Sequence, residues 1–320
     1  MDGSKYAIGV DFGTESGRAV LIETKTGKEI AGSVYYYQNG VIDEQLPVEG
    51  HPITLEPEWA LQDPEDYIRT FQKTIPDVLA QAGIQPEEVI GIGIDFTACT
   101  ILPVKSDGTP LCTLPEYRRN PHSWVKLWKH HAAQPEADKI NATARRLGEP
   151  WLDRYGGKIS SEWFFSKTLQ ILDEAPDIYE AADRLIEAAD WVVWQLTGVE
   201  KRNSCTAGYK AMWSKREGYP PNDYFKALDP RLENVVDRRQ KQQVEKPTSR
   251  PGRADCGDRM NKNIGRVRQP VEQNHHAPEN PASGANVSLG LPLKYLDQRE
   301  DGERTHRYED HKCRGLVEED

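Results

Sequence analysis

The residues best suited to chemistry stand close together near the start of the chain. Asp11 supplies a carboxylate, the kind of oxygen ligand that a nucleotide-bound Mg²⁺ accepts directly or through water. Gly13 lets backbone approach a ligand closely, and Thr14 adds a hydroxyl donor. Arg18 adds a planar cation that suits phosphate oxygens. These residue types at this spacing predict a hairpin that holds the phosphates of a nucleotide.

The same spacing leaves a simpler explanation open. It matches neither the GxxxxGK[ST] pattern of P-loop proteins nor the GxGxxG pattern of Rossmann folds. Gly17, like Gly13, removes a side chain where backbone turns sharply or approaches a ligand. In an ordinary glycine-containing turn, Asp11 and Thr14 would simply bond local backbone. On spacing alone we weigh that turn slightly above a phosphate site.

A second candidate segment follows the apolar residues 89–96, which predict a strand buried on both faces. The chain leaves this strand through Asp95, Thr97 and Ala98. Ligands of open α/β sheets bind beyond the carboxyl ends of the strands. The small side chain of Ala98 would let a polyhydroxyl ligand contact backbone there. A strand followed by a plain capped turn explains these residues equally well.

A third candidate is Lys210, which stands among small and aromatic residues in 203–213 and could donate to sugar hydroxyls. An exposed lysine on a loop is the simpler alternative, and the residue types by themselves favour it. His130 and His131 are weak metal ligands because neighbouring helical residues point about 100° apart. We expect them to be surface or substrate-side polar groups.

The tryptophans of the helical region could stack on a sugar, but core packing is the better prediction. They are Trp163, Trp191 and Trp194.

The elements that would position these residues can be predicted from periodicity. Residues 6–10, 19–23 and 29–37 predict strands joined by tight turns, and Asp63-Pro64 predicts the start of a helix. Residues 101–104 and 110–114 predict a hairpin about Asp107-Gly108. We expect helices over 121–131, 136–147, 160–174 and 179–196. Strands followed by strand–helix alternation predict an α/β fold, a mixed sheet flanked by helices.

The whole chain excludes several function classes. It has 320 residues and a formal net charge of −10, which disfavours a nucleic-acid partner. Its apolar runs are too short to span a bilayer, so we expect no membrane partner. Five scattered cysteines without a CxxC pair predict neither a disulfide framework nor a zinc site. We therefore expect a reduced, cytoplasmic protein.

Composition changes abruptly near residue 236. All eight tryptophans and all six phenylalanines precede that point. Residues 237–320 are rich in charged residues, Asn, Gln and Pro, and too poor in apolar ones to offset the entropy of ordering a core. We therefore predict a globular domain over residues 1–236 and a disordered, low-hydrophobicity tail over residues 237–320.

Taken together, these segments resemble the amino-terminal domain of the FGGY carbohydrate kinases, in the actin-like ATPase (ribonuclease H-like) superfamily. The resemblance rests on residues 11–18 (DFGTESGR), 94–97 (IDFT) and 196–198 (LTG). Three further stretches narrow it to the branch that phosphorylates L-ribulose. They are residues 114–122 (LPEYRRNPH), 127–132 (LWKHHA) and 208–213 (GYKAMW).

The resemblance implies transfer of the γ-phosphoryl group of ATP, with Mg²⁺, to L-ribulose or a related pentulose, giving L-ribulose 5-phosphate in L-arabinose catabolism. Carried over by position, Asp11 would assist Mg²⁺, and the nucleotide phosphates would face Gly13, Thr14 and Arg18. The sugar pocket would be lined by Ala98 and Lys210. For full-length members of the family, the resemblance also implies that they can form homo-oligomers.

The family places its catalytic base, an Asp of a Gly-x-x-Asp-x-His segment, in a second domain, for which this sequence offers no match. Asp255 and Asp258 do not fit that segment, so no catalytic residue is assigned. A frameshifted or truncated gene would produce such a break, and translating the downstream DNA in the other frames tests this hypothesis. We expect a chain inactive by itself.

Two other functions stay open at this point. A non-catalytic module that binds sugar or phosphate, or that assembles with a partner, would also use these residues. An actin-like ATPase of chaperone type is the weaker alternative, because the sugar-side segments argue against it.

Overall fold

The computed structural model describes residues 4–240 of the chain. The strands in this range are short to medium in length. They are β1 (Tyr6–Phe12), β2 (Ser16–Glu23), β3 (Glu29–Tyr36), β4 (Leu61–Gln62), β5 (Val89–Phe96), β6 (Ile101–Val104), β7 (Val125–Lys126) and β8 (Arg184–Glu187). The α-helices are α1 (Pro64–Ala82), α2 (Gln134–Leu147), α3 (Phe164–Glu174), α4 (Pro176–Ala181), α5 (Ala188–Thr197), α6 (Ser204–Lys210) and α7 (Asn222–Leu228).

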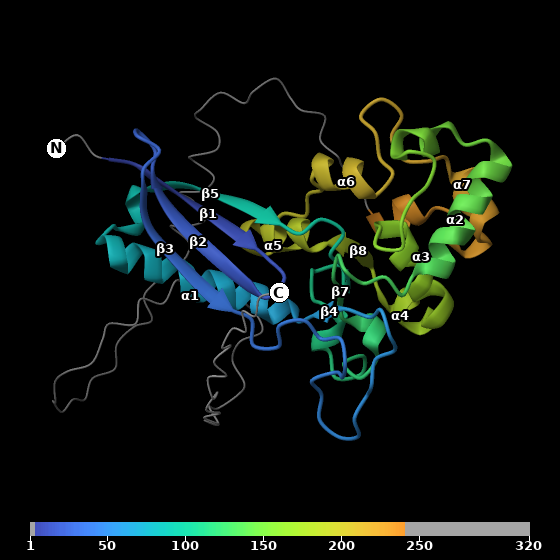
Figure 1. Ribbon diagram of the computed structural model, residues 1–320, viewed down its shortest axis with the longest axis horizontal. Helices are drawn as coiled ribbons and strands as arrows, with labels where there is room; N and C mark the ends of the chain where they lie inside the picture. The colour runs from blue at the N-terminus through green and yellow to red at the C-terminus, as the bar shows by residue number, and fades with distance from the viewer. Residues whose placement is uncertain (1–3, 241–320) are drawn as a thin grey trace, which may run out of the picture. The chain divides into compact units, whose positions relative to one another are not determined.

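The first sheet has the strand order β3-β2-β1-β5 (Figure 1). The predicted meander is confirmed, since β1 pairs with β2 and β2 with β3 in antiparallel register. The predicted start of α1 is also confirmed. The Asp63 side chain accepts a hydrogen bond from the Glu65 N–H, and a proline opens the first turn. β1 then pairs with β5 in parallel register, so the sheet is mixed, as expected.

The two faces of this sheet differ. Ile8, Val10 and Phe12 point into a core that also contains apolar side chains of α1 and α5. The opposite face stays half-buried or exposed along the described strands. The prediction that residues 89–96 are buried on both faces is wrong. β5 is an edge strand of this sheet, and its Ile90 is 57% exposed.

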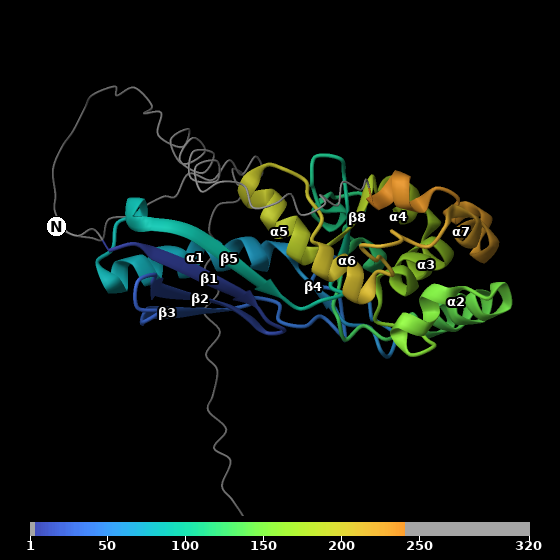
Figure 2. The ribbon, with the colours of Figure 1, turned by 90° about the horizontal axis from the view of Figure 1, so that it is seen from above.

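The second sheet has the order β4-β7-β6-β8 and lies beside the helices α2, α3, α4 and α7 (Figures 1 and 2). Apolar residues of these helices form a second core with Ile101 of β6. The predicted turn about Asp107-Gly108 is present, because the Lys105 N–H donates to the Thr109 carbonyl. The predicted partner strand 110–114 is not formed: a single bridge at Pro110 is followed by a 3₁₀ turn, Leu111–Thr113.

Three helix predictions are corrected. The segment 121–131 contains a 3₁₀ turn, Pro121–Ser123, and the two-residue strand β7, because β4 and β6 pair with residues 125 and 126. The segment 179–196 divides into α4, β8 and α5, since β8 completes the second sheet by pairing with β6. The helix expected from residue 160 begins at Phe164, with Trp163 as an N-cap that makes no side-chain capping bond.

Several other expectations are confirmed. α2 and the left-handed Gly198 that ends α5 match their predictions. Trp191 and Trp194 are buried in the first core, whereas Trp163 is only half-buried. Within residues 4–240, no helix combines the length and apolar character needed to cross a membrane. The tail prediction falls almost wholly on residues 241–320, outside the described residues.

Candidate functional site

The hairpin between β1 and β2 presents its charged residues on the open face of the first sheet. An Arg18 guanidinium nitrogen lies 3.6 Å from an Asp11 carboxylate oxygen, and the two side chains are 56% and 45% exposed. Asp11 of β1 pairs in register with Arg18 of β2 on one side and with Asp95 of β5 on the other. A cation and two carboxylates therefore stand in one row at the carboxyl ends of β1 and β5. Solvent or a ligand can reach this row.

The loop that closes this hairpin is held from several directions. The Gly13 N–H donates to the Ser16 carbonyl at 3.0 Å. The Gln62 side chain donates to the Thr14 carbonyl at 2.7 Å, and the Trp128 indole N–H donates to the Thr14 hydroxyl at 3.1 Å. Because that hydroxyl oxygen accepts from Trp128, its proton is left to donate outward. The loop is thus fixed with a hydroxyl donor available at its tip.

The two glycines of this hairpin have different roles. A Cβ on Gly13 would lie 3.1 Å from the Ser16 carbonyl and 3.3 Å from the Arg18 guanidinium. A Cβ on Gly17 would lie 2.3 Å from the Thr70 side chain of α1. Gly17 therefore lets helix and sheet approach each other, which makes its role structural.

The turn after β5 lies next to this hairpin. The Thr97 N–H donates to the Phe12 carbonyl at 3.4 Å, which ties the turn to the end of β1. Ala98 is half-buried, and the following Cys99 has a φ of 69°, in the left-handed region that a side chain rarely adopts. The Cys99 side chain is fully buried. The turn that presents Ala98 is therefore tightly defined.

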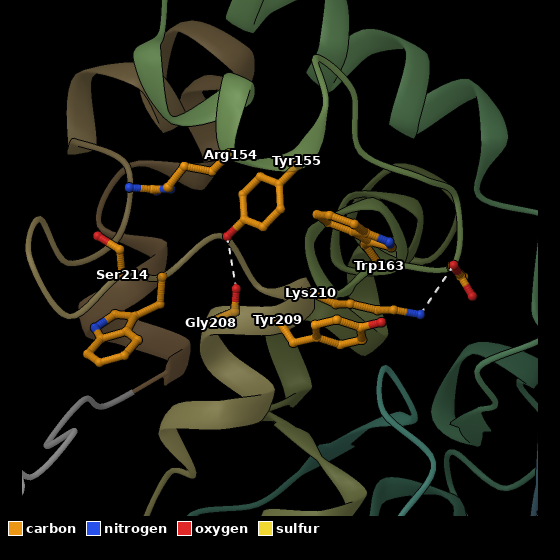
Figure 3. Close-up of a pocket in the computed structure, with 9 residues that line it drawn as sticks. Arg154, Tyr155, Trp163, Gly208, Tyr209, Lys210 and Ser214 are labelled. Carbon is orange, nitrogen blue, oxygen red and sulfur yellow. Dashed lines mark hydrogen bonds and ion pairs between the residues drawn. The ribbon is translucent and has the colours of Figure 1, made fainter.

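Lys210 ends the helix α6, which Asn203 caps, so the simpler alternative of a lysine on a loop is wrong. The Lys210 ammonium lies 3.3 Å from a Glu162 carboxylate oxygen (Figure 3). Burial by itself lowers the pKa of Lys210, but the Glu162 carboxylate outweighs it, so the pKa is raised and the ammonium stays charged.

An open hollow of about 560 Å³ adjoins Lys210. Its lining is aromatic and polar, as Figure 3 shows. The lining residues are Arg154, Tyr155, Glu162, Trp163, Gly208, Tyr209, Lys210, Trp213 and Ser214. Aromatic faces with a few charged groups suit a small polyhydroxyl ligand.

The comparisons with known proteins identify the family. A model described as the N-terminal domain of the FGGY family of carbohydrate kinases matches residues 6–218. The chain belongs to the FGGY family of carbohydrate kinases. It is 58% identical over 233 residues to a ribulokinase of Halalkalibacterium halodurans, and 57% over 235 residues to a ribulokinase of Geobacillus thermodenitrificans. These matches cover 73% of this chain and 41% of each relative, so the chain spans about two fifths of their length.

Solved FGGY-type kinases share the fold. A gluconate kinase from Lactobacillus acidophilus superposes with a TM-score of 0.53 at 18% identity, covering 70% of this chain and 40% of that one. A xylulose kinase from Rhodospirillum rubrum gives 0.52 at 16% identity, again with 70% and 40% coverage. The expected actin-like architecture is confirmed.

His130 is not a surface group of this FGGY domain, which corrects our expectation. It is fully buried, its Nδ1 accepts from the Ala60 N–H at 3.2 Å, and its Nε2 lies 2.8 Å from the Gln170 amide oxygen. Burial lowers the pKa of His130 well below its ordinary value. Among the described residues, no group of three or more His, Cys, Asp or Glu side chains could hold a metal ion.

Sequence reasoning missed the buried polar groups that support the site. Gln62, which holds the Thr14 loop, is itself held by the Tyr67 hydroxyl at 2.6 Å. Lys167 and Glu187 lie beneath the turn after β5. Their signal was a polar residue at helical spacing from apolar ones, such as Lys167, three residues after Phe164 and four before Ile171. Polarity at a buried helix position requires a partner.

Proposed function

We propose that this chain is the part of an L-ribulose kinase that holds the sugar and the nucleotide phosphates. The observation that supports this most is the parallel pairing of β1 with β5, since it sets the phosphate hairpin beside the Ala98 turn. The relatives named ribulokinase supply the acceptor class, L-ribulose or a related pentulose. The reaction would yield L-ribulose 5-phosphate.

On the phosphate side, we assign Asp11, Gly13, Thr14 and Arg18 to MgATP. The half-exposed Asp11 carboxylate is a suitable oxygen ligand for Mg²⁺, directly or through water. Gly13 leaves the hairpin backbone uncovered, and the Thr14 hydroxyl is oriented by Trp128. Arg18 can turn from Asp11 to phosphate oxygens. Phosphoryl transfer depends mainly on such positioning and charge neutralisation, which the bound Mg²⁺ would extend.

On the sugar side, we assign Ala98 and Lys210. The Ala98 methyl group leaves backbone accessible to sugar hydroxyls. The Lys210 ammonium, held by Glu162, can donate to a sugar oxygen while keeping its charge. Asp255 and Asp258 lie outside the described residues, and we assign no catalytic base.

Calorimetry on Lys210→Met tests the sugar site. We expect L-ribulose affinity to fall at least tenfold, with MgATP affinity unchanged. Lys226→Met is the matched control, because Lys226 also pairs with a glutamate, Glu233 at 2.9 Å, but lies on α7. Equal L-ribulose affinity in Lys210→Met and the wild-type chain would contradict the assignment.

The activity of this 320-residue chain by itself is tested separately. We expect turnover of L-ribulose and MgATP far below an ordinary kinase rate, because we assign no catalytic base. Without a group that acts on the transition state, an enzyme loses orders of magnitude in rate. A coupled assay that finds ordinary turnover would contradict this. The alternative, a non-catalytic sugar-binding module, predicts sugar binding without any nucleotide binding. We place the protein in the cytoplasm, in line with its scattered cysteines.

A further inference from the structure

A buried lysine of α3 contacts both halves of the candidate site from below. Lys167 has no exposed surface. Its ammonium donates to the Cys99 carbonyl at 2.6 Å and to the Leu127 carbonyl at 2.7 Å. It also reaches the Lys126 carbonyl at 3.5 Å. One cation therefore joins the turn after β5 to the segment around β7, two parts of the chain that are remote in sequence.

Each of these carbonyls stands next to a residue that faces the candidate ligands. Cys99 follows Ala98, the proposed sugar contact, and its left-handed φ of 69° is strained for a residue with a side chain. Leu127 precedes Trp128, whose indole orients the Thr14 hydroxyl on the phosphate hairpin. Fixing these two carbonyls fixes the sugar turn and the support of the phosphate loop relative to each other.

The Lys167 ammonium can hold the two carbonyls because it stays charged although it is buried. Burial has the largest effect on the Lys167 ammonium and lowers its pKa to about 8, so the group is still charged at neutral pH. Glu187 is buried, and its carboxylate lies close enough to the Cys99 backbone for that backbone to lower its pKa. A lysine held this deeply has no access to solvent or substrate, so its role acts through the groups that it holds.

We propose that Lys167 is a positioning residue for the acceptor site: it fixes the Ala98–Cys99 turn against the segment that carries Trp128. This inference rests on the proposed function for its sugar-binding consequence. The positioning of the turn itself does not depend on any ligand.

Lys167→Met removes the ammonium and keeps an unbranched apolar side chain. We expect hydrogen exchange of peptides covering residues 97–100 and 127–129 to accelerate at least tenfold, with α1 unchanged. L-ribulose affinity, measured by calorimetry, should fall at least tenfold. Lys167→Gln, which keeps a neutral donor, should give smaller changes in both measurements and serves if the methionine variant does not fold.

Lys126→Met is the matched control. Lys126 is also fully buried, but its ammonium lies against other groups, 3.9 Å from the Trp59 ring centre and 3.4 Å from the His130 Nε2. This variant should leave exchange at 97–100 and L-ribulose affinity within twofold of the wild-type chain.

The outcomes separate the two claims. Unchanged exchange at 97–100 in both Lys167 variants overturns the positioning role. Faster exchange with unchanged L-ribulose affinity shows a purely structural role and overturns the link to the sugar site. A wild-type chain that binds no L-ribulose contradicts the proposed function, while accelerated exchange in Lys167→Met still supports the clamp on the turn.

Discussion

Two glycines four residues apart show how one motif combines ligand binding with packing. Gly13 stands at the tip of the phosphate hairpin, where a side chain would meet a carbonyl and a guanidinium. Gly17 stands in β2, where a side chain would meet Thr70 of α1. A side chain at position 13 would limit how closely a ligand approaches the hairpin. A side chain at position 17 would limit how closely α1 approaches the sheet. A substitution at each should therefore affect different measurements.

Gly17→Ala should destabilise the fold, because its Cβ would lie 2.3 Å from the Thr70 side chain. Overpacking of this kind costs about 1–3 kcal/mol of unfolding free energy, measurable by urea titration. Gly91→Ala in β5 is the control, since a Cβ there meets nothing within 4 Å. A loss in Gly91→Ala equal to that in Gly17→Ala would point to backbone entropy or sheet propensity and contradict the packing explanation.

At the scale of elements, the junction between β8 and α5 carries an unusual group. Glu187 ends β8 and is fully buried. Burial, and next the Asp190 carboxylate, raise the pKa of Glu187 to about 8, against the lowering effects of Lys167, the Cys99 backbone and Lys210. The native state therefore holds a proton that the unfolded chain releases. This junction should make stability depend on pH.

Glu187 should contribute a fall in the unfolding free energy as pH rises from 6 to 8, whereas the buried Lys126, whose pKa is lowered well below its ordinary value, contributes in the opposite direction. The unfolded Glu187 is ionised throughout this window, since its ordinary pKa is 4.5, while the native one gives up its proton only near pH 8. Glu187→Gln should remove this slope, worth about 2–3 kcal/mol over the window, in urea titrations at several pH values. The pKa values of Asp63 and Asp190 are raised to about 6, so their slopes lie mainly below it.

The same urea titrations test whether Glu187 is the group that carries the titrating proton. Burial lowers the pKa of Lys167 to about 8, so its effect appears above that pH and has the opposite sign. Glu56→Gln changes an exposed carboxylate and should leave the slope intact. A slope that is the same in Glu187→Gln and in the wild-type chain would show that Glu187 does not carry the titrating proton.

At the scale of the whole molecule, we expect the open face of the first sheet to promote self-association. Asp95, Asp11, Arg18 and Val34 form one row across it, because each pairs with the next in strand register. Val34, at the end of this row, is 50% exposed, and Tyr36 on the same strand is 76% exposed. They lie on β3, an edge strand of the sheet. An exposed apolar edge is a template for association.

The double variant Val34→Lys, Tyr36→Lys should reduce self-association of the chain without lowering its thermal midpoint by more than about 2 °C, because both side chains are exposed. Light scattering at rising protein concentration measures this effect. Leu147→Lys, on α2 and 42% exposed, is the control for added charge alone. Equal suppression by Leu147→Lys would show that a lysine added anywhere on the surface, and not a change on this face, reduces the association.

Local chemistry by itself determined much of this protein. Residues 11–18, the Asp63-Pro64 helix start and Gly198 act through neighbours in the chain, so their types and spacing predicted the hairpin, the helix start and the helix end. Family membership also followed from such motifs, since their residues are contiguous. Whether the hairpin and Lys210 bind phosphates and sugar stays a prediction until the variants are measured.

Tertiary structure decided what depends on contacts between remote segments. The segment 179–196 is predicted from the sequence as one helix, yet β8 forms inside it because β6 offers strand partners 80 or more residues away. His130 has polar chemistry suited to a surface, but Ala60 and Gln170 satisfy both ring nitrogens in the core. Lys167 is chemically an ordinary lysine. Only the fold brings the Cys99 and Leu127 carbonyls to its ammonium, because no local rule specifies which distant backbone a buried cation will meet.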